Sequence, residues 1–231
     1  PYGTFSGTGQ ANCTVCPAGF SCSSPEKYPQ ICAVGYYSPG GSAACSACTP
    51  GYRCPIGSTN PSPVGSECPE GSYCNPSSIL TLCSAGTYGN ITAGRSQEHA
   101  CTAVEAGYYA PGEGNTKDTR TLCEAGYYCP AGSSAPVACP AGYFNPDVGR
   151  SSVASCQLCN EGFYCAAGSS SSTAVVPAGY FAPAGTGSYD SYPCPAGTFS
   201  GDRTGLHDSS QCHNCKYFPS PTLPLPRTTR I

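Results

Sequence analysis

The chain has 231 residues, of which 20 are cysteine, 29 glycine and 24 proline, with no methionine or tryptophan and a formal net charge of −3. So much cysteine with so few large apolar residues excludes an ordinary single core and is typical of small repeats held by disulfides. The absence of a basic run argues against nucleic-acid binding, and no apolar run approaches the length of a membrane span. This cysteine usage predicts an extracellular or cell-surface location, where disulfides persist.

One short motif recurs along the chain and is clearest at Cys123-Glu-Ala-Gly-Tyr-Tyr-Cys129. A cysteine opens it, a glycine follows three residues later, one or two aromatic residues come next, and a second cysteine closes it after six residues. The glycine suits a turn with a positive φ, and the aromatic residues suit the start of a short strand. Further short copies begin at Cys16, Cys48, Cys68 and Cys159.

A longer version of the motif has the same start, but its second cysteine comes much later. Long loops open at Cys32, Cys83, Cys139 and Cys194, at successive steps of 51, 56 and 55 residues. This period predicts a linear array whose units contact mainly their neighbours. The predicted units are a partial repeat at 1–31, repeat blocks at 32–82, 83–138 and 139–193, a partial repeat at 194–217 and an extended proline-rich tail at 218–231.

Two copies of the short motif have no cysteine, and they indicate which cysteines pair. Val104 and Ala110 replace both cysteines of one copy, and Val176 and Ala182 replace both in another. Loss in pairs is expected when the two cysteines of one motif bond each other, because losing one alone would leave a free thiol. The predicted short-motif pairs are Cys16–Cys22, Cys48–Cys54, Cys68–Cys74, Cys123–Cys129 and Cys159–Cys165.

The long loops are expected to pair within themselves as well. Cys83 and Cys101 remain although the neighbouring motif has lost both cysteines, so these two should bond each other. A crossed pattern between adjacent loops is the alternative, because connectivity does not follow from spacing alone. By analogy with the first long-loop pair, the others are Cys32–Cys45, Cys139–Cys156 and Cys194–Cys212.

Cys13 and Cys215 are left over after these pairs. Cys13 would close a long loop whose opening cysteine should stand three residues before Gly3, and Cys215 opens a short loop whose closing position is Pro221. Either the chain is a segment whose upstream part holds the partner of Cys13, or Cys215 of one subunit bonds Cys13 of the next. A head-to-tail contact that does not close on itself generates a filament.

The short motif, with Cys-x-x-Cys linking successive loops, resembles the ephrin-receptor-like cysteine-rich repeat over residues 1–217. The modules of tumour-necrosis-factor receptors look like more distant relatives. Such repeats occur in receptor ectodomains and, in long arrays, in large surface proteins. The resemblance implies a disulfide-rich extracellular module but leaves function open, because such a scaffold does not fix function.

Chemical sites are another explanation for so many cysteines. Structural zinc would use Cys-x-x-Cys pairs, but further cysteines follow each pair at short spacing and only three histidines are present. Cys212-His-Asn-Cys215 resembles a redox motif but lacks the helix and sheet of a thioredoxin-like site. No nucleophile elbow, phosphate loop or clustered carboxylate pair is visible, so we expect no enzyme activity, no cofactor and no catalytic or metal site.

Two N-glycosylation acceptors are present, Asn90-Ile-Thr and the weaker Asn12-Cys-Thr, which its neighbouring cysteine hinders. The sequence thus predicts an elongated linear array of short β-hairpins and irregular loops with almost no helix. We expect a non-enzymatic, secreted glycoprotein that builds an extracellular filament, appendage or coat, with copies of itself or other extracellular proteins as partners. A ligand-binding or spacer segment of a receptor or other cell-surface ectodomain is the alternative.

Overall fold

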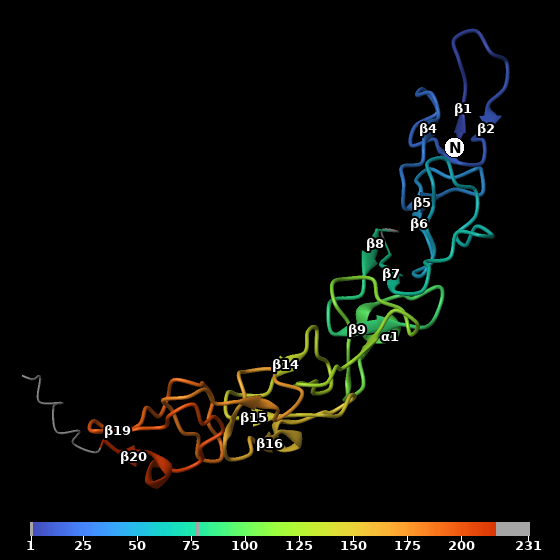
Figure 1. Ribbon diagram of the computed structural model, residues 1–231. Helices are drawn as coiled ribbons and strands as arrows, with labels where there is room; N and C mark the ends of the chain where they lie inside the picture. The colour runs from blue at the N-terminus through green and yellow to red at the C-terminus, as the bar shows by residue number, and fades with distance from the viewer. Residues whose placement is uncertain (1, 77–78, 216–231) are drawn as a thin grey trace, which may run out of the picture. The chain divides into compact units, whose positions relative to one another are not determined.

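Short antiparallel hairpins make up most of the chain in the computed structural model, which describes residues 2–76 and 79–215 (Figure 1). Ten two-stranded sheets follow one another, each formed by strands adjacent in the sequence. Two further hairpins are closed by single antiparallel bridges, Tyr52 with Glu67 and Tyr180 with Pro193. The prediction of small disulfide-rich hairpin repeats with almost no helix is confirmed.

The strands are two or three residues long. The paired strands are β1 (Thr4–Phe5) with β2 (Thr14–Val15), β3 (Phe20–Ser21) with β4 (Gln30–Ile31), β5 (Tyr36–Tyr37) with β6 (Ser46–Ala47), β7 (Ser72–Cys74) with β8 (Leu80–Leu82), β9 (Thr87–Gly89) with β10 (Cys101–Ala103), β11 (Tyr108–Tyr109) with β12 (Thr121–Leu122), β13 (Tyr127–Tyr128) with β14 (Val137–Ala138), β15 (Tyr143–Phe144) with β16 (Gln157–Leu158), β17 (Phe163–Tyr164) with β18 (Ala174–Val175), and β19 (Thr198–Phe199) with β20 (His213–Asn214).

Three single helical turns occur in the described residues, and each ends directly before the late cysteine of a long loop. They are α1 (Gln97–Ala100) and the 3-10 helices η1 (Val153–Ser155) and η2 (Ser209–Gln211). Capping explains where two of them begin. Ser96 accepts a hydrogen bond from the His99 N–H, and Asp208 forms a capping box with Gln211.

Every hairpin follows one frame with three shared positions. We call them the opening position, the frame glycine three residues later, and the closing position six residues after the opening one. From Cys22 onward the closing residue is buried in each hairpin, whether or not it is cysteine. The closing residues are Ser6, Cys22, Ser38, Cys54, Cys74, Gly89, Ala110, Cys129, Asn145, Cys165, Ala182 and Ser200.

At eight of the hairpins, the frame glycine is joined to the next hairpin through its own backbone. The Gly107 N–H donates to the Cys129 carbonyl at 2.8 Å, and the Cys123 N–H donates to the Gly107 carbonyl at 2.9 Å. Cys123 and Cys129 both belong to the next hairpin. The N–H and the carbonyl of Gly107 are therefore both hydrogen-bonded across the junction. The frame glycines that donate in this way are Gly3, Gly19, Gly35, Gly51, Gly86, Gly107, Gly142 and Gly162.

Two more backbone hydrogen bonds recur at most junctions. The closing Ala110 N–H donates to the Ser133 carbonyl at 3.0 Å. In return, the Gly132 N–H donates to the carbonyl of the opening residue Val104 at 2.8 Å. Because these bonds use only backbone groups, the junction can be repeated with different side chains.

The frame glycine also touches the hairpin two places further on. A Cβ atom added to Gly107 would lie 2.5 Å from the Gly149 carbonyl oxygen, and Gly107 has a φ of +92°. No other residue fits here, because the carbonyl occupies the place of the side chain and L-residues avoid this φ. The same approach, at 2.1–2.6 Å, is found at Gly3, Gly19, Gly51, Gly71, Gly86, Gly107, Gly142 and Gly162.

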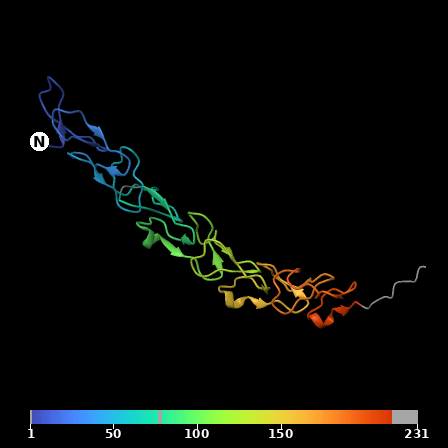
Figure 2. The ribbon, with the colours of Figure 1, turned by 90° about the vertical axis from the view of Figure 1, so that its left-hand side faces the viewer.

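The chain forms two compact units. Among the described residues, the first contains 2–76, 79–138 and 146–155, and the second contains 139–145 and 156–215. In both views of the ribbon, the hairpins of the first unit follow one another in chain order, from the blue β1 to the yellow-green β14 (Figures 1 and 2). In this unit, contact therefore runs from each hairpin to the next one and to the one after it, as in other repeat proteins.

Substitution of Gly107 by alanine tests the close approach. Gly112→Ala is the matched control, because Gly112 also has a positive φ, of +68°, but has no atom within 4 Å of an added Cβ. We expect the control to lose about 1 kcal/mol of unfolding free energy from the strained φ. Gly107→Ala should lose roughly 1–3 kcal/mol more, because the carbonyl must move. Urea unfolding under non-reducing conditions measures both, and equal losses would contradict the steric role.

Candidate functional site

Nine disulfides cross-link the hairpins. Each joins the two cysteines that the sequence analysis pairs within one loop. The pairs of the structure are Cys16–Cys22, Cys32–Cys45, Cys48–Cys54, Cys68–Cys74, Cys83–Cys101, Cys123–Cys129, Cys139–Cys156, Cys159–Cys165 and Cys194–Cys212. Most of the opening and closing cysteines are almost fully buried. A disulfide content of this kind is typical of extracellular and secreted proteins.

Two hairpins contain no cysteine, and these cysteine-free hairpins keep the same fold. Val104 and Ala110, at the opening and closing positions of one of them, are 0% exposed, as are Val176 and Ala182 in the other. The Val104 N–H donates to the Gly86 carbonyl at 3.0 Å, the bond that an opening cysteine makes elsewhere. A small apolar pair therefore occupies the space of the disulfide.

An ionic and aromatic cluster lies beside the first of these hairpins. The Arg120 guanidinium lies 4.8 Å from the centre of the Tyr108 ring and 5.5 Å from that of Tyr88, and it forms an ion pair with Glu105. The Tyr88 hydroxyl donates to the Glu105 carboxylate at 3.1 Å. Tyr88 is also packed against Val104 and Ala110, so this cluster covers the apolar pair.

The electrostatics of the cluster shift two acidic groups in opposite directions. The hydrogen bond from Arg120 lowers the pKa of Glu105, because it stabilises the carboxylate. Burial, and then the hydrogen bond to Glu105, raise the pKa of Tyr88. At neutral pH the cluster therefore holds one cation, one anion and a neutral tyrosine hydroxyl.

Aromatic rings gather at the second cysteine-free hairpin. The Tyr189 ring meets the edge of Tyr164 at 5.9 Å and that of Tyr180 at 6.1 Å between ring centres. Phe181 and Tyr192 are 5.6 Å apart. Edge-to-face contacts of this kind stabilise beyond the area they bury. In both cysteine-free hairpins, a side chain from the loop thus makes contacts where the disulfide is missing: Arg120 in the first and Tyr189 in the second.

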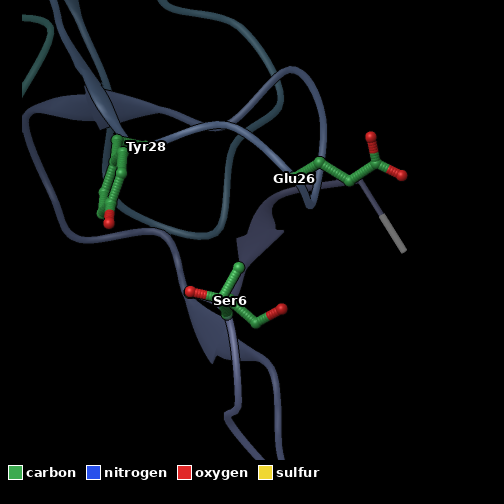
Figure 3. Close-up of a pocket in the computed structure, with 5 residues that line it drawn as sticks. Ser6, Glu26 and Tyr28 are labelled. Atoms are coloured by element: carbon green, nitrogen blue, oxygen red, sulfur yellow. The ribbon is translucent and has the colours of Figure 1, made fainter.

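The remaining surface carries open hollows. One of about 310 Å³ lies among Ser6, Glu26 and Tyr28, and the Glu26 carboxylate points away from the Tyr28 ring (Figure 3). Within residues 2–76 and 79–215, no three His, Cys, Asp or Glu side chains lie close enough to hold a metal ion. No helix in this part of the chain is both long and apolar enough to cross a membrane.

Cys13 and Cys215 are both exposed and carry free thiols. The Cys215 N–H donates to the Gly197 carbonyl at 2.9 Å, so Cys215 stands at an opening position. Pro221, its expected closing position, and the proline-rich tail at 218–231 lie outside the described residues. Asn90, directly after β9, and Asn12 are exposed, which an N-glycosylation acceptor requires.

The Arg120–Glu105 pair and the Tyr189 contacts were not foreseen from the sequence. Arg120 and Tyr189 lie in the loops between motifs, whose residues follow no repeated pattern. The available signal was the position of Glu105, which follows the substituted opening residue Val104. A missing disulfide is thus the sequence signal for charged and aromatic contacts in the same loop.

No known family model matches this sequence, and a search of curated proteins found no match. The likeness to ephrin-receptor-like repeats therefore rests on the spacing of cysteine, glycine and aromatic residues.

Replacement of both cysteines of one disulfide tests whether a valine–alanine pair can take its place. Cys123→Val with Cys129→Ala copies the arrangement at Val104 and Ala110. We expect the double variant to fold and to lose about 2 kcal/mol or less, the entropic value of so short a cross-linked loop. Cys129→Ala alone should be worse, because it leaves a free thiol that can exchange with other disulfides. Urea unfolding measures the free energy of unfolding of both variants, and disulfide mapping shows whether the other disulfides are native. Equal loss of stability in the two variants would contradict the idea that valine and alanine can replace the disulfide.

Glu105→Gln tests the ionic cluster through pH. The folded-state pKa of Glu105 is lowered, so its contribution is fully present above the unfolded value of about 4.3 and is lost as pH falls through the folded value. At pH 7 we expect a loss of at most about 1 kcal/mol, because the Glu105 side chain is 51% exposed and solvent screens the pair. The difference from the unsubstituted chain should vanish at the acid end of a pH series of thermal melts.

Glu113→Gln is the control for this series, because Glu113 is exposed and takes part in neither ion pair of the described residues. It should leave stability unchanged across the series. A loss for Glu105→Gln that persists below the folded pKa would show that packing, not charge, explains its role.

Proposed function

We propose that this chain is a non-enzymatic structural protein that builds an extracellular filament, appendage or coat. One observation carries the proposal. The same backbone hydrogen bonds join successive hairpins within each compact unit, and they depend on glycine and on small buried closing residues. A junction that repeats without change suits a protein whose task is to extend, because each added hairpin presents the surface that the next one needs.

The disulfides support an oxidising location for this role. Each covalent loop spans 6 to 18 residues, so a reducing environment would remove the main cross-links of a chain with little apolar core. Exposed acceptors at Asn90 and Asn12 are compatible with a secreted glycoprotein. The proposed likeness to ephrin-receptor-like arrays of large surface proteins agrees with the same location.

Electron microscopy of native material from the extracellular fraction tests the proposal. We expect regular filaments or a layered coat whose mass, after release of N-glycans, is made up largely by this chain. Labelling with an antibody against the β13–β14 hairpin would assign the chain to the assembly. Isolated particles that bind a soluble ligand would instead favour a receptor ectodomain. Catalytic turnover would exclude a purely structural role if one point substitution abolished it while the substituted chain still folded.

A further inference from the structure

A hollow of about 420 Å³ opens between two hairpins of the first unit. One side is the hairpin closed by the bridge between Tyr52 and Glu67, and the other is the loop between β9 and α1. This loop belongs to the hairpin two places further along the chain. The lining of the hollow includes Thr49, Tyr52, Thr92, Ala93, Arg95 and His99.

Ala93 has an unusual backbone conformation in this lining. Its φ is +56°, and it is the only residue other than glycine with a positive φ in the described part of the chain. Its carbonyl oxygen meets the frame glycine Gly51, where an added Cβ would lie 2.4 Å away. At the other seven close approaches of this kind, glycine supplies the carbonyl: Gly41, Gly57, Gly114, Gly132, Gly149, Gly185 and Gly205.

The methyl group of Ala93 is therefore not required by the fold. Alanine is strained at a positive φ, whereas glycine adopts it freely. The methyl group is the one group that alanine adds to glycine, and Ala93 is half-buried in the lining of the hollow. Backbone strain of this kind is characteristic of functional sites, which makes the hollow a candidate for binding.

The polar side chains of the hollow are not used by the fold. Arg95 and His99 are exposed, and their side chains form no ion pair or hydrogen bond within residues 2–76 and 79–215. Thr49 accepts a hydrogen bond from the Ser62 hydroxyl at 3.1 Å, so the Thr49 hydroxyl proton can still be donated. None of the described lining residues is acidic. The hollow thus presents one cation together with free hydrogen-bonding groups.

Backbone hydrogen bonds fix the loop on both sides of Arg95. The Ala93 N–H donates to the Cys68 carbonyl at 2.8 Å, and the Gly94 carbonyl accepts from the Cys74 N–H at 2.9 Å. After Arg95, Ser96 caps α1 by accepting from the His99 N–H. The loop is therefore ordered before any ligand binds, which lowers the entropic cost of binding.

We propose that this hollow binds one acidic sugar residue of an extracellular saccharide. The Tyr52 ring and the Ala93 methyl group form an apolar surface for the C–H face of the sugar ring. Arg95 pairs with the carboxylate or sulfate group of the sugar, and the Thr49 hydroxyl and the His99 ring bond its hydroxyl groups. A single cation beside an aromatic ring matches one acidic group on one sugar ring. This binding role goes beyond the proposed structural function and does not depend on filament formation.

The acidic sugar has two possible sources. Thr92 lines the hollow and is also the third residue of the N-glycosylation acceptor Asn90-Ile-Thr. A glycan attached to Asn90 therefore begins two residues from the lining, so it could place an acidic sugar of its own in the hollow. A separate acidic polysaccharide outside the cell is the other source.

Calorimetric titration with a heparin-derived tetrasaccharide, which carries carboxylate and sulfate groups, tests the site. The full chain with Asn90→Gln has no glycan at this acceptor and should bind the tetrasaccharide. The neutral tetrasaccharide of N-acetylglucosamine should bind about tenfold more weakly or worse, because it has no partner for the guanidinium group. Equal affinity for the two saccharides, or no binding of the heparin fragment, would overturn the proposal.

Arg95→Gln in the same chain tests the charge, with Arg53→Gln as its matched control. Arg53 is also exposed and without an ion pair in the described residues. It follows Tyr52 directly, so its side chain lies on the opposite face of the same hairpin. The dissociation constant should rise about tenfold or more for Arg95→Gln and stay unchanged for Arg53→Gln. Equal weakening by both would mean that the saccharide responds to positive charge in general, and would rule out this site.

Ala93→Gly separates binding from folding. It supplies the glycine that the other seven close approaches have, so the chain should unfold at the same temperature or a higher one. The dissociation constant should nevertheless rise about fourfold, the value of one lost methyl contact. Unchanged affinity would overturn the role of the methyl group, and a lower unfolding temperature would show that the fold needs it.

The glycosylated chain distinguishes the two sources of the sugar. Binding of the heparin fragment to the glycosylated chain as tight as to Asn90→Gln would identify a separate polysaccharide as the ligand. Binding to Asn90→Gln alone, with an acidic sugar found in the Asn90 glycan by mass spectrometry, would identify the chain's own glycan. A neutral glycan that blocks the hollow would exclude the glycan as the ligand.

The binding role and the structural function fail separately. Native filaments from a chain that binds neither saccharide would leave the structural function standing and remove the sugar site. Specific binding that is lost with Arg95→Gln, without any filament or coat in native material, would support the sugar site and remove the proposed function.

Discussion

The close approach of a glycine Cα to a carbonyl oxygen two hairpins away is the constraint on which the rest of the structure depends. At Gly107 the Gly149 carbonyl occupies the space that a side chain would need. With the backbone this close, the N–H and carbonyl of the same glycine reach the next hairpin, and the opening and closing residues are buried beneath it. The fold therefore needs little apolar volume, which agrees with a sequence poor in leucine and isoleucine.

The hairpins and their loop pairing could be read from the sequence because they depend on residues within about twenty positions of each other. Val104 and Ala110 replace the opening and the closing cysteine of one motif together, which indicates that these two positions bond each other in the other motifs. The contact between Gly107 and Gly149 could not be foreseen, since both are glycines in separate loops and no side chain marks their approach. The Arg120 cluster was missed for a related reason: it depends on how the loop folds back over its own hairpin.

The two cysteine-free hairpins separate two roles that cysteine combines elsewhere. One role is to fill the space between successive hairpins, and Val104 with Ala110 fill it at 0% exposure. The other is to restrict the unfolded chain, which valine and alanine do not do. At these hairpins, noncovalent contacts of Arg120, Glu105 and Tyr189 stabilise the folded loop instead. The fold of a hairpin thus comes from its backbone contacts, and the disulfide adds stability to it.

A junction made of backbone groups has a consequence for how such a chain can change in length. Hairpins meet their neighbours through the same atoms although their covalent loops differ in length, as those of Cys83–Cys101 and Cys123–Cys129 do on either side of β11–β12. A gene segment that encodes one hairpin could therefore be duplicated or deleted, and the flanking hairpins would still find matching partners. The number of hairpins is then not limited by a single core, as the size of an ordinary globular domain is.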